Sequence, residues 1–312
     1  MVCKECTHNP IITLPNSNSH RCGSCFNKYV QKKVGQTISK YKLIKRDDHV
    51  VVGASGGKDS TALLYLLLSM QKKLPFRMTA LAIDEGIDGY RDESLVFLKN
   101  FCIQHNIELK IVAFQEMFGK KLMEMLNGQK PCSVCGVLRR YLLNYYAKEL
   151  QATRLATGHN LDDEAQTILM NQFKQNVKMQ ARLGPITGIK EDPRFIRRIK
   201  PLYFLTEKEI ATYAYHNNLM DEFSECPNEK FSFRADVRDT INTLEEKYPG
   251  TKHNIIVAFL EILPLLKESQ DIQEPIQECS TCGEPCSQEQ CQACKTIEKL
   301  GICNVLATSK RI

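Results

Sequence analysis

The sequence lacks a long apolar run, an apolar leader and a strong excess of charge of one sign. Its longest apolar stretch, residues 63–70, is far shorter than the roughly 18 residues that a membrane-spanning helix needs. The first ten residues, MVCKECTHNP, lack the apolar core of a secretory signal peptide. We therefore expect a cytoplasmic protein without a membrane partner. The net charge of +6, from 42 Lys and Arg against 36 Asp and Glu, permits a polyanionic partner but does not require one.

The composition is that of a globular protein. With 312 residues, 43% hydrophobic and 25% charged, the chain has the length for one large domain plus small modules, and wholesale disorder is excluded. Most of its 14 cysteines lie in close CxxC pairs. A secreted disulfide framework is one interpretation of such pairs. Metal binding is favoured over it, because intracellular thiols stay reduced and CxxC pairs there usually hold metal.

The chain divides into three parts. Residues 1–26 and 279–312 are short and rich in paired cysteines, whereas residues 27–268 carry the long hydrophobic periodicities. Residues 269–278 are polar and are predicted to form a linker. The central part is predicted to be the catalytic domain, with a mostly helical C-terminal portion.

Strands and helices are predicted to alternate in the central part. Short β-branched or apolar runs predict strands at residues 49–53, 78–83, 108–114 and 154–157. Helical patterns occupy residues 60–72, 94–105, 137–150, 161–174, 236–248 and 252–267, and a capping box at Thr206 begins one more helix. This alternation predicts an α/β fold with a doubly wound parallel sheet covered on both faces.

Each terminal part holds two CxxC pairs, whose spacing favours a tetrahedral Zn²⁺ site of four thiolates. The predicted ligands are Cys3, Cys6, Cys22 and Cys25 in an N-terminal zinc finger, and Cys279, Cys282, Cys291 and Cys294 in a C-terminal zinc ribbon. Each part is too small to build a core, so the metal would supply much of its folding energy. His8 or His20 could replace a ligand in the first set, and Cys286 could do so in the second. Cys303 is surplus, and Cys102 is predicted to lie in the core.

A glycine-rich segment, GASGGKDS at residues 53–60, lies between a predicted strand and a predicted helix. Its glycines allow the backbone to wrap around an anion, and a helix start favours phosphate. The sequence is not a Walker A loop, because Val52 takes the place of the first glycine and Asp59 that of the magnesium-binding hydroxyl. A turn without a ligand is the alternative.

A second segment, TGHNLDDEA at residues 157–165, also follows a strand and opens a helix. Because the carboxyl ends of parallel strands share one edge of the sheet, we expect both segments at the same crevice. Taken alone, the second segment is also compatible with an ordinary helix start rich in acids.

Three further cysteines, Cys132, Cys135 and Cys226, have no nearby pair that would complete a tetrahedral zinc site. Three thiolates can hold a [4Fe–4S] cluster with one iron left open, although four cysteines are commoner. A redox pair that carries sulfur as a persulfide is a second interpretation. Three buried packing cysteines are the third.

The SGGKDS loop followed by the second segment resembles the PP-loop ATP pyrophosphatases, which cleave ATP between the α- and β-phosphates and adenylate a carbonyl oxygen. The resemblance implies a loop that holds the phosphates, with Asp59 helping to place Mg²⁺, and nucleotide or metal contacts from the second segment. Arg139, one helical turn beyond Cys135, is interpreted as a phosphate clamp or as a surface arginine. The implied ATP-site residues are Ala54, Ser55, Gly56, Gly57, Lys58, Asp59, Ser60, Ile83, Asp84, Arg139, Gly158 and Asp163.

The CxxC pair followed by a distant Cys-Pro, with a cysteine module at each end of the chain, resembles tRNA thiolases of the TtuA/NcsA type. The resemblance implies a tRNA 2-thiouridine synthetase that uses ATP, Mg²⁺, two Zn²⁺ ions and a [4Fe–4S] cluster. The implied catalytic residues are Lys58, Asp59, Cys132, Cys135 and Cys226. Uridine 34 is favoured over uridine 54. Free sulfide, a desulfurase or a thiocarboxylated ubiquitin-like carrier could donate the sulfur, and such proteins often form homodimers.

Two other functions stay open. Another PP-loop ligase, of the lysidine or amide-forming type, would not need the three cysteines. A zinc-stabilised RNA-binding protein without activity would not need Lys58, Asp59 and Asp163.

Two basic clusters could bind the tRNA backbone. The first has no acid among its members, Lys28, Lys32, Lys33, Lys40, Lys42, Lys45 and Arg46. The second, diluted by Glu191 and Asp192, consists of Lys190, Arg194, Arg197, Arg198 and Lys200. A solvated surface is the alternative for both.

Overall fold

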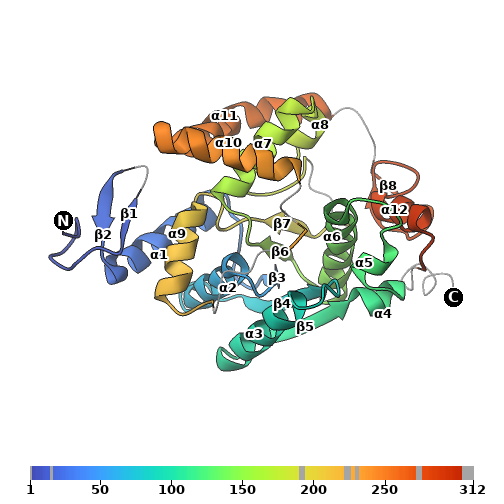
Figure 1. Ribbon diagram of the computed structural model, residues 1–312, viewed down its shortest axis with the longest axis horizontal. Coiled ribbons are helices and arrows are strands. Elements are labelled where there is room, and N and C mark those ends of the chain that lie inside the picture. Colours follow the sequence, from blue (N-terminus) through green and yellow to red (C-terminus); the bar gives the residue numbers. More distant parts are fainter. Residues whose placement is uncertain are drawn as a thin grey trace.

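The fold is built around one parallel sheet, shown in a computed structural model of the chain (Figure 1). The structure describes residues 2–14, 17–189, 194–220, 226–228, 232–271 and 276–303. The sheet has the order β5-β4-β3-β6-β7, and every neighbouring pair is parallel. The strands are β3 (His49–Gly53), β4 (Arg77–Asp84), β5 (Glu108–Ala113), β6 (Arg154–Thr157) and β7 (Arg197–Ile199). The predicted doubly wound fold is confirmed.

The direction in which strands are added to the sheet reverses between β3 and β6. From β3 the chain builds β4 and β5 on one side, then crosses to β6 and β7 on the other. Gly53 and Thr157, the last residues of these two strands, are register partners. The loops that follow them therefore leave the sheet side by side, at the kind of crevice where open α/β sheets bind ligands.

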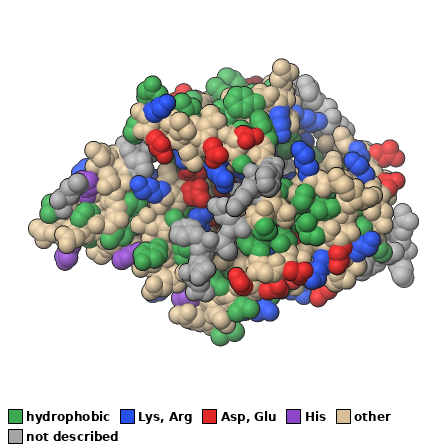
Figure 2. All heavy atoms as spheres, in the orientation of Figure 1, with side chains coloured by type: hydrophobic (Ala, Val, Ile, Leu, Met, Phe, Trp, Pro, Cys, Tyr) green, Lys and Arg blue, Asp and Glu red, His purple; other side chains and the backbone are tan. Residues whose placement is uncertain are grey.

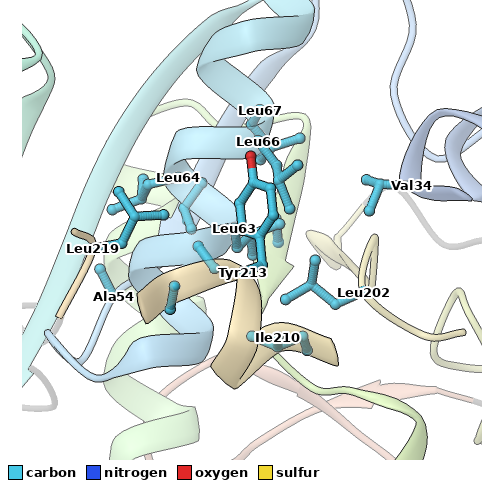
Figure 3. Close-up of a cluster of buried hydrophobic side chains, with 14 of the residues drawn as sticks. Val34, Ala54, Leu63, Leu64, Leu66, Leu67, Leu202, Ile210, Tyr213 and Leu219 are labelled. Atoms are coloured by element: carbon cyan, nitrogen blue, oxygen red, sulfur yellow. The ribbon is translucent and has the colours of Figure 1, made fainter. Parts of the chain in front are cut away.

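One face of the sheet is covered by α1 (Gly23–Lys40), α2 (Lys58–Gln71), α3 (Arg91–Gln104) and α9 (Glu207–His216). Figure 3 shows leucines of α2 gathered around Tyr213 and Ile210 of α9. Leu63 and Leu67 are fully buried, and burying each such side chain contributes about 1.5–3 kcal/mol. This packing fixes α2, and with it the glycine-rich loop that precedes it.

The opposite face is covered by α4 (Phe114–Phe118), α5 (Leu122–Met125) and α6 (Pro131–Glu149). The strand alternation divides the two faces, since Val50 and Val52 pack in the first core and Val51 in the second. Helix α6 begins six residues earlier than the sequence predicted. Pro131 is its first residue, a position where the missing N–H and the fixed φ of proline are tolerated.

A separate helical layer packs beside the sheet at the top of Figure 1. It contains α7 (Leu161–Phe173), α8 (Val177–Gln180), α10 (Phe233–Lys247) and α11 (Thr251–Asp271). Helix α11 runs to Asp271, into the predicted linker, whose residues 272–275 lie outside the described part. No helix among the described residues has the length and apolar character to cross a membrane.

The two cysteine-rich ends join the body differently. At the N-terminus, the hairpin of β1 (Ile12–Leu14) and β2 (Ser19–Arg21) leads into α1, so the predicted boundary between residues 26 and 27 falls inside a continuous helix. At the C-terminus, β8 (Gln277–Glu278), β9 (Pro285–Cys286) and α12 (Gln292–Leu300) pack on α6 (Figure 1). The division into three domains remains a prediction, and residues 304–312 lie outside the described part.

Candidate active site

The loop after β3 has a backbone shape that requires glycine. Gly56 adopts a φ of +82°, and a Cβ there would lie 2.1 Å from the backbone oxygen of Ser94. The loop is closed by the Ser60 hydroxyl, which accepts a hydrogen bond from the Ser55 N–H at 3.1 Å and donates to the Gly57 carbonyl at 3.0 Å. The loop is thus pre-shaped, with Ser55, Gly56 and Gly57 ahead of the first turn of α2.

Lys58 and Asp59 form the charged part of the loop. The Lys58 Nζ donates to Asp59 Oδ2 at 3.1 Å and to Glu207 Oε1 at 3.0 Å. Burial acts to lower the pKa of Lys58, but these two carboxylates outweigh it and raise the pKa above the usual value for lysine. Burial, opposed by Lys58, raises the pKa of Asp59. Lys58 is therefore a fixed cation at the mouth of the loop.

The segment after β6 lies against this loop. A Cβ on Gly158 would come within 3.1 Å of the Asp59 backbone, so glycine permits the close approach. Asn160 caps α7, and its side-chain amide donates to Asp59 Oδ1 at 3.1 Å. Burial raises the pKa of Asp163, which also faces the Arg234 guanidinium at 3.6 Å. The structure therefore brings the two predicted segments together.

The remaining nucleotide-site predictions receive less support from the geometry. Ala54 and Ile83 are buried in the two opposite cores. Asp84 accepts a hydrogen bond from the Gly86 N–H at 2.8 Å, at the turn that ends β4. Their predicted contacts with nucleotide remain predictions.

A cavity of about 330 Å³ opens beside the loop. Lys58 and Glu207 line it together with Asp162 of α7 and Lys252 of α11, which form an ion pair with each other. Lysines and carboxylates thus contribute charges of both signs to its wall.

The central cysteines Cys132, Cys135 and Cys226 lie at the same edge of the sheet, near the start of α6. Cys132 is exposed and donates to the Asn228 carbonyl at 3.2 Å, which places the segment of Cys226 beside it. Cys135 is buried and accepts a hydrogen bond from Arg139 Nη2 at 3.1 Å. Burial raises the pKa of the Cys135 thiol to about 11. Cys226 packs against the same core as Cys135.

These three sulfurs do not form a compact set. Among the described residues, only the terminal cysteines gather with all ligand atoms within 4.8 Å of one another. Sulfurs around one tetrahedral zinc lie about 3.8 Å apart, given Zn–S bonds of about 2.3 Å. In a [4Fe–4S] cluster each cysteine binds a different iron, so the sulfurs must be farther apart. The three sulfurs therefore lack the compact spacing of the terminal sets, and this spacing does not exclude a cluster.

The terminal sets match the predicted ligands and could each hold a metal ion. They are Cys3, Cys6, Cys22 and Cys25, and Cys279, Cys282, Cys291 and Cys294. Sulfur–sulfur distances of 3.4 Å between Cys6 and Cys22 and 3.8 Å between Cys282 and Cys291 suit tetrahedral coordination. Hydrogen bonds from Ser24 and neighbouring groups lower the pKa of Cys22 to about 6, and those from Cys282 and Cys294 lower the pKa of Cys291 to about 4. Both shifts favour the thiolate, the form that binds metal. Hydrogen bonds within the sets also raise the pKa of Cys25 and of Cys294, so the thiolate charge is distributed unevenly within each set.

The other sulfur predictions are resolved by the same geometry. His8, His20 and Cys286 are outside the two compact sets. Cys286 instead donates to the Gln288 carbonyl at 2.7 Å. Cys102 is buried in the first core, as predicted.

Four charged residues at the site were not predicted from the sequence: Glu85, Arg91, Glu207 and Arg234. Glu85 directly follows β4 and is fully buried, as is Arg91 at the start of α3. The sequence offers one indication that Glu85 belongs to the site, namely its position directly after a strand of the parallel sheet. The partners of Glu207 and Arg234 come from α2 and α7, far away in the sequence, so no local pattern identifies these two residues.

Comparison with known proteins identifies the family to which the chain belongs. A model of the PP-loop domain matches residues 26–244, so the chain belongs to the PP-loop family of ATP-utilising proteins. It is 36% identical over 309 residues to a probable sulfurtransferase of Methanocaldococcus jannaschii, covering 96% of this chain and 88% of the relative. It is also 36% identical over 295 residues to the tRNA-5-methyluridine(54) 2-sulfurtransferase of Pyrococcus horikoshii, with 95% and 93% covered.

A solved structure indicates the group within this family to which the chain belongs. The U34-tRNA thiolase NcsA from Methanococcus maripaludis, determined with its [4Fe–4S] cluster, superposes with a TM-score of 0.84 at 35% identity, covering 97% of this chain and 98% of that one. The chain is thus an enzyme of the NcsA/TtuA-type group of PP-loop tRNA sulfurtransferases.

Proposed function

We propose that this protein 2-thiolates a uridine of tRNA, at position 34 in preference to 54, by adenylating the C2 carbonyl oxygen and replacing it with sulfur. One observation carries the proposal. The glycine-rich loop and the Cys135 region are linked at one sheet edge: Arg91 donates to the Ser55 carbonyl, and Arg91 and Arg139, the neighbour of Cys135, both contact Glu85. Such proximity is what a two-step substitution in a single pocket requires.

The first step needs ATP held with its α-phosphorus facing the uridine. The pre-shaped loop offers backbone N–H groups at the start of α2 to the phosphates. Lys58 supplies a permanent cation there, and Asp59 and Asp163 supply carboxylates suited to Mg²⁺. The uridine O2 attacks the α-phosphorus, pyrophosphate leaves, and the oxygen becomes part of an AMP leaving group.

The second step needs a sulfur nucleophile at C2 of the activated base. In this proposal Cys132, Cys135 and Cys226 hold the [4Fe–4S] cluster, which, when bound, offers an iron without a protein ligand to an incoming sulfide. The described residues fit this group, because Cys132 and Cys135 lie in the first turns of α6, Cys132 contacts the segment of Cys226 through the Asn228 carbonyl, and none of the three belongs to a compact zinc-like set. Arg139 places a cation beside Cys135, where thiolate charge must be stabilised. AMP then leaves with the former carbonyl oxygen.

The tRNA would lie over α1. Lys28, Lys32, Lys40 and Lys42 are exposed, and such a stripe suits phosphate backbones. Lys33 is excluded from the stripe, because it pairs with Glu209 at 3.2 Å. In the second cluster Lys200 is buried against Glu164 at 2.7 Å, and Lys190 lies outside the described residues. Figure 2 shows further Lys and Arg side chains gathered toward the upper right of the face that it displays.

The terminal cysteine sets would each bind Zn²⁺ in a structural role. Four cysteine ligands leave no open coordination position for a substrate. The sets therefore serve folding and docking in this proposal, and the chemistry stays with the three central cysteines.

The direct test uses anaerobically prepared protein, ATP, Mg²⁺, sulfide and unmodified tRNA. Mass spectrometry of digested fragments is expected to find 2-thiouridine in the anticodon fragment, with pyrophosphate formed in step. Thiolation at residue 54 instead would correct the position only. Pyrophosphate without thiolation would favour another PP-loop ligase, and neither product would favour an inactive RNA-binding protein. Replacing sulfide by a thiocarboxylated carrier protein tests the donor.

A further inference from the structure

We infer that Glu85 is a positioning residue that holds the nucleotide loop and the cysteine site in fixed relation. The inference rests on the proposed function for its catalytic meaning, but its geometry can be tested independently of activity.

Glu85 is a carboxylate with no contact with solvent, clamped between two guanidinium groups. Its Oε2 accepts a hydrogen bond from Arg91 Nε at 2.6 Å. Its Oε1 lies 2.6 Å from Arg139 Nε. Arg91 is only 2% exposed, so this pair is fully desolvated. A buried charge is costly to leave unpaired, so Glu85 fixes Arg91 strongly. The Arg139 side chain is 41% exposed, so solvent partly screens its ion pair with Glu85.

The two arginines reach in opposite directions. Arg91 Nη1 donates to the Ser55 carbonyl at 2.8 Å, inside the loop that is proposed to hold the phosphates. Arg139 Nη2 donates to the Cys135 sulfur at 3.1 Å. An unbroken chain of contacts thus runs from Ser55 through Arg91, Glu85 and Arg139 to Cys135.

The backbone around Glu85 is also held in place. The Glu85 carbonyl accepts a hydrogen bond from the Leu122 N–H at 2.9 Å. The next residue, Gly86, has a φ of +67°, and a Cβ there would lie 2.7 Å from the Lys121 side chain. The carboxylate therefore projects from a rigid turn. Glu85 can thus hold Arg91, on the side of the nucleotide loop, and Arg139, on the side of the cysteine site, in fixed positions; these two sides are the half-sites.

The proposed reaction requires the nucleotide loop and the cysteine site to be aligned. An adenylated uridine that meets no sulfur nucleophile is open to water, which returns uridine and AMP with ATP consumed. A misplacement of about 1 Å is enough to lose a large part of the rate. The ratio of pyrophosphate released to 2-thiouridine formed therefore reports whether the two half-sites are aligned.

The test compares Glu85→Gln with Glu108→Gln. Glutamine has nearly the same shape as glutamate but places an amide donor where an arginine needs an acceptor. Glu108 is an exposed carboxylate that pairs with Arg77 at 3.0 Å at the opposite edge of the sheet, so it is the matched control. For Glu85→Gln we expect at least a fivefold rise in pyrophosphate released per 2-thiouridine formed. Loss of folded protein alone lowers both products equally and leaves the ratio unchanged.

A crystal structure of Glu85→Gln supplies a readout without catalysis. We expect Arg139 to leave hydrogen-bond distance of Cys135, while Glu108→Gln keeps it. If wild-type protein forms no 2-thiouridine, the proposed function fails and this structure alone decides the inference. If Glu85→Gln does not fold, Glu85→Asp replaces it, because the shorter carboxylate keeps the charge but cannot reach both arginines. Three outcomes would overturn the inference. The first is an unchanged ratio of pyrophosphate to 2-thiouridine in a variant that thiolates tRNA. The others are a retained hydrogen bond from Arg139 to Cys135 in the variant structure, and insolubility of both variants.

Discussion

The terminal and central cysteines differ in how the fold holds them. At each end four sulfurs gather within 4.8 Å of one another. Cys132, Cys135 and Cys226 share one edge of the sheet but do not form such a set. A closed set saturates one ion and serves folding, whereas an open set leaves room for a larger inorganic group and a reactant. In the proposed function, cysteines of the same chemistry therefore have different roles because their spacing differs.

The largest effect should come from Asp59→Ala, which disables the nucleotide half of the central site. Removal of this carboxylate takes away the partner of both Lys58 and Asn160. We expect at least a 100-fold loss of pyrophosphate release with tRNA present, with both terminal metals retained. Metal analysis and pyrophosphate assay check this, with Asp88→Ala, at an exposed carboxylate on the loop before α3, as the control. Near-normal turnover would exclude the role assigned to Asp59.

Cys226→Ala should separate the two kinds of cysteine site. We expect loss of iron and at least a 100-fold loss of thiolation, because two thiolates are too few to retain the cluster. ATP binding and the zinc content of both ends should not change. Cys286→Ala is the control, since Cys286 has similar exposure and lies outside both compact sets. Thiolation by the Cys226 variant at the wild-type rate would dismiss the three-cysteine site.

The sequence was sufficient to predict the parts of the site that follow from local patterns. The strands at residues 49–53 and 154–157 are confirmed at their predicted ends, because β-branched or apolar residues stop there at glycine-containing turns. The two compact cysteine sets follow from CxxC spacing in the same way. The start of α6 was missed, because cysteines and proline carry no helical periodicity.

Long-range partners were beyond sequence reasoning. Arg139 was predicted as a phosphate clamp or a surface residue, but the structure pairs it with Glu85 and Cys135. Lys33 was placed in the basic stripe, yet it pairs with Glu209, 176 residues away. Such contacts depend on how helices pack on the sheet, and a local pattern carries no information about them.

Cys282→Ser tests the closed C-terminal set, with a smaller expected effect. This module packs on α6, and Lys148 of α6 pairs with Glu284 at 2.9 Å. Loss of the metal should loosen the module and lower Tm by about 5–10 °C, as expected for a loss of a few kcal/mol. Thiolation should fall only severalfold, through looser support of α6. Calorimetry and zinc analysis measure this, with exposed Cys303→Ser as the control. A loss of thiolation as large as that of Cys226→Ala would refute the contrast between closed and open sites.

The smallest effect is expected from the surface of α1, which extends the N-terminal module toward the body. Replacing Lys32, Lys40 and Lys42 by Gln removes three exposed charges without touching a described ion pair. If each contacts one phosphate, the log–log salt dependence of tRNA affinity should flatten by about 2–3 units, while kcat at saturating tRNA stays near the wild-type value. Exposed Lys72 and Lys73, at the end of α2, supply the control variants. An unchanged salt slope would show that tRNA binds elsewhere, and the N-terminal cysteine set would then act on folding alone.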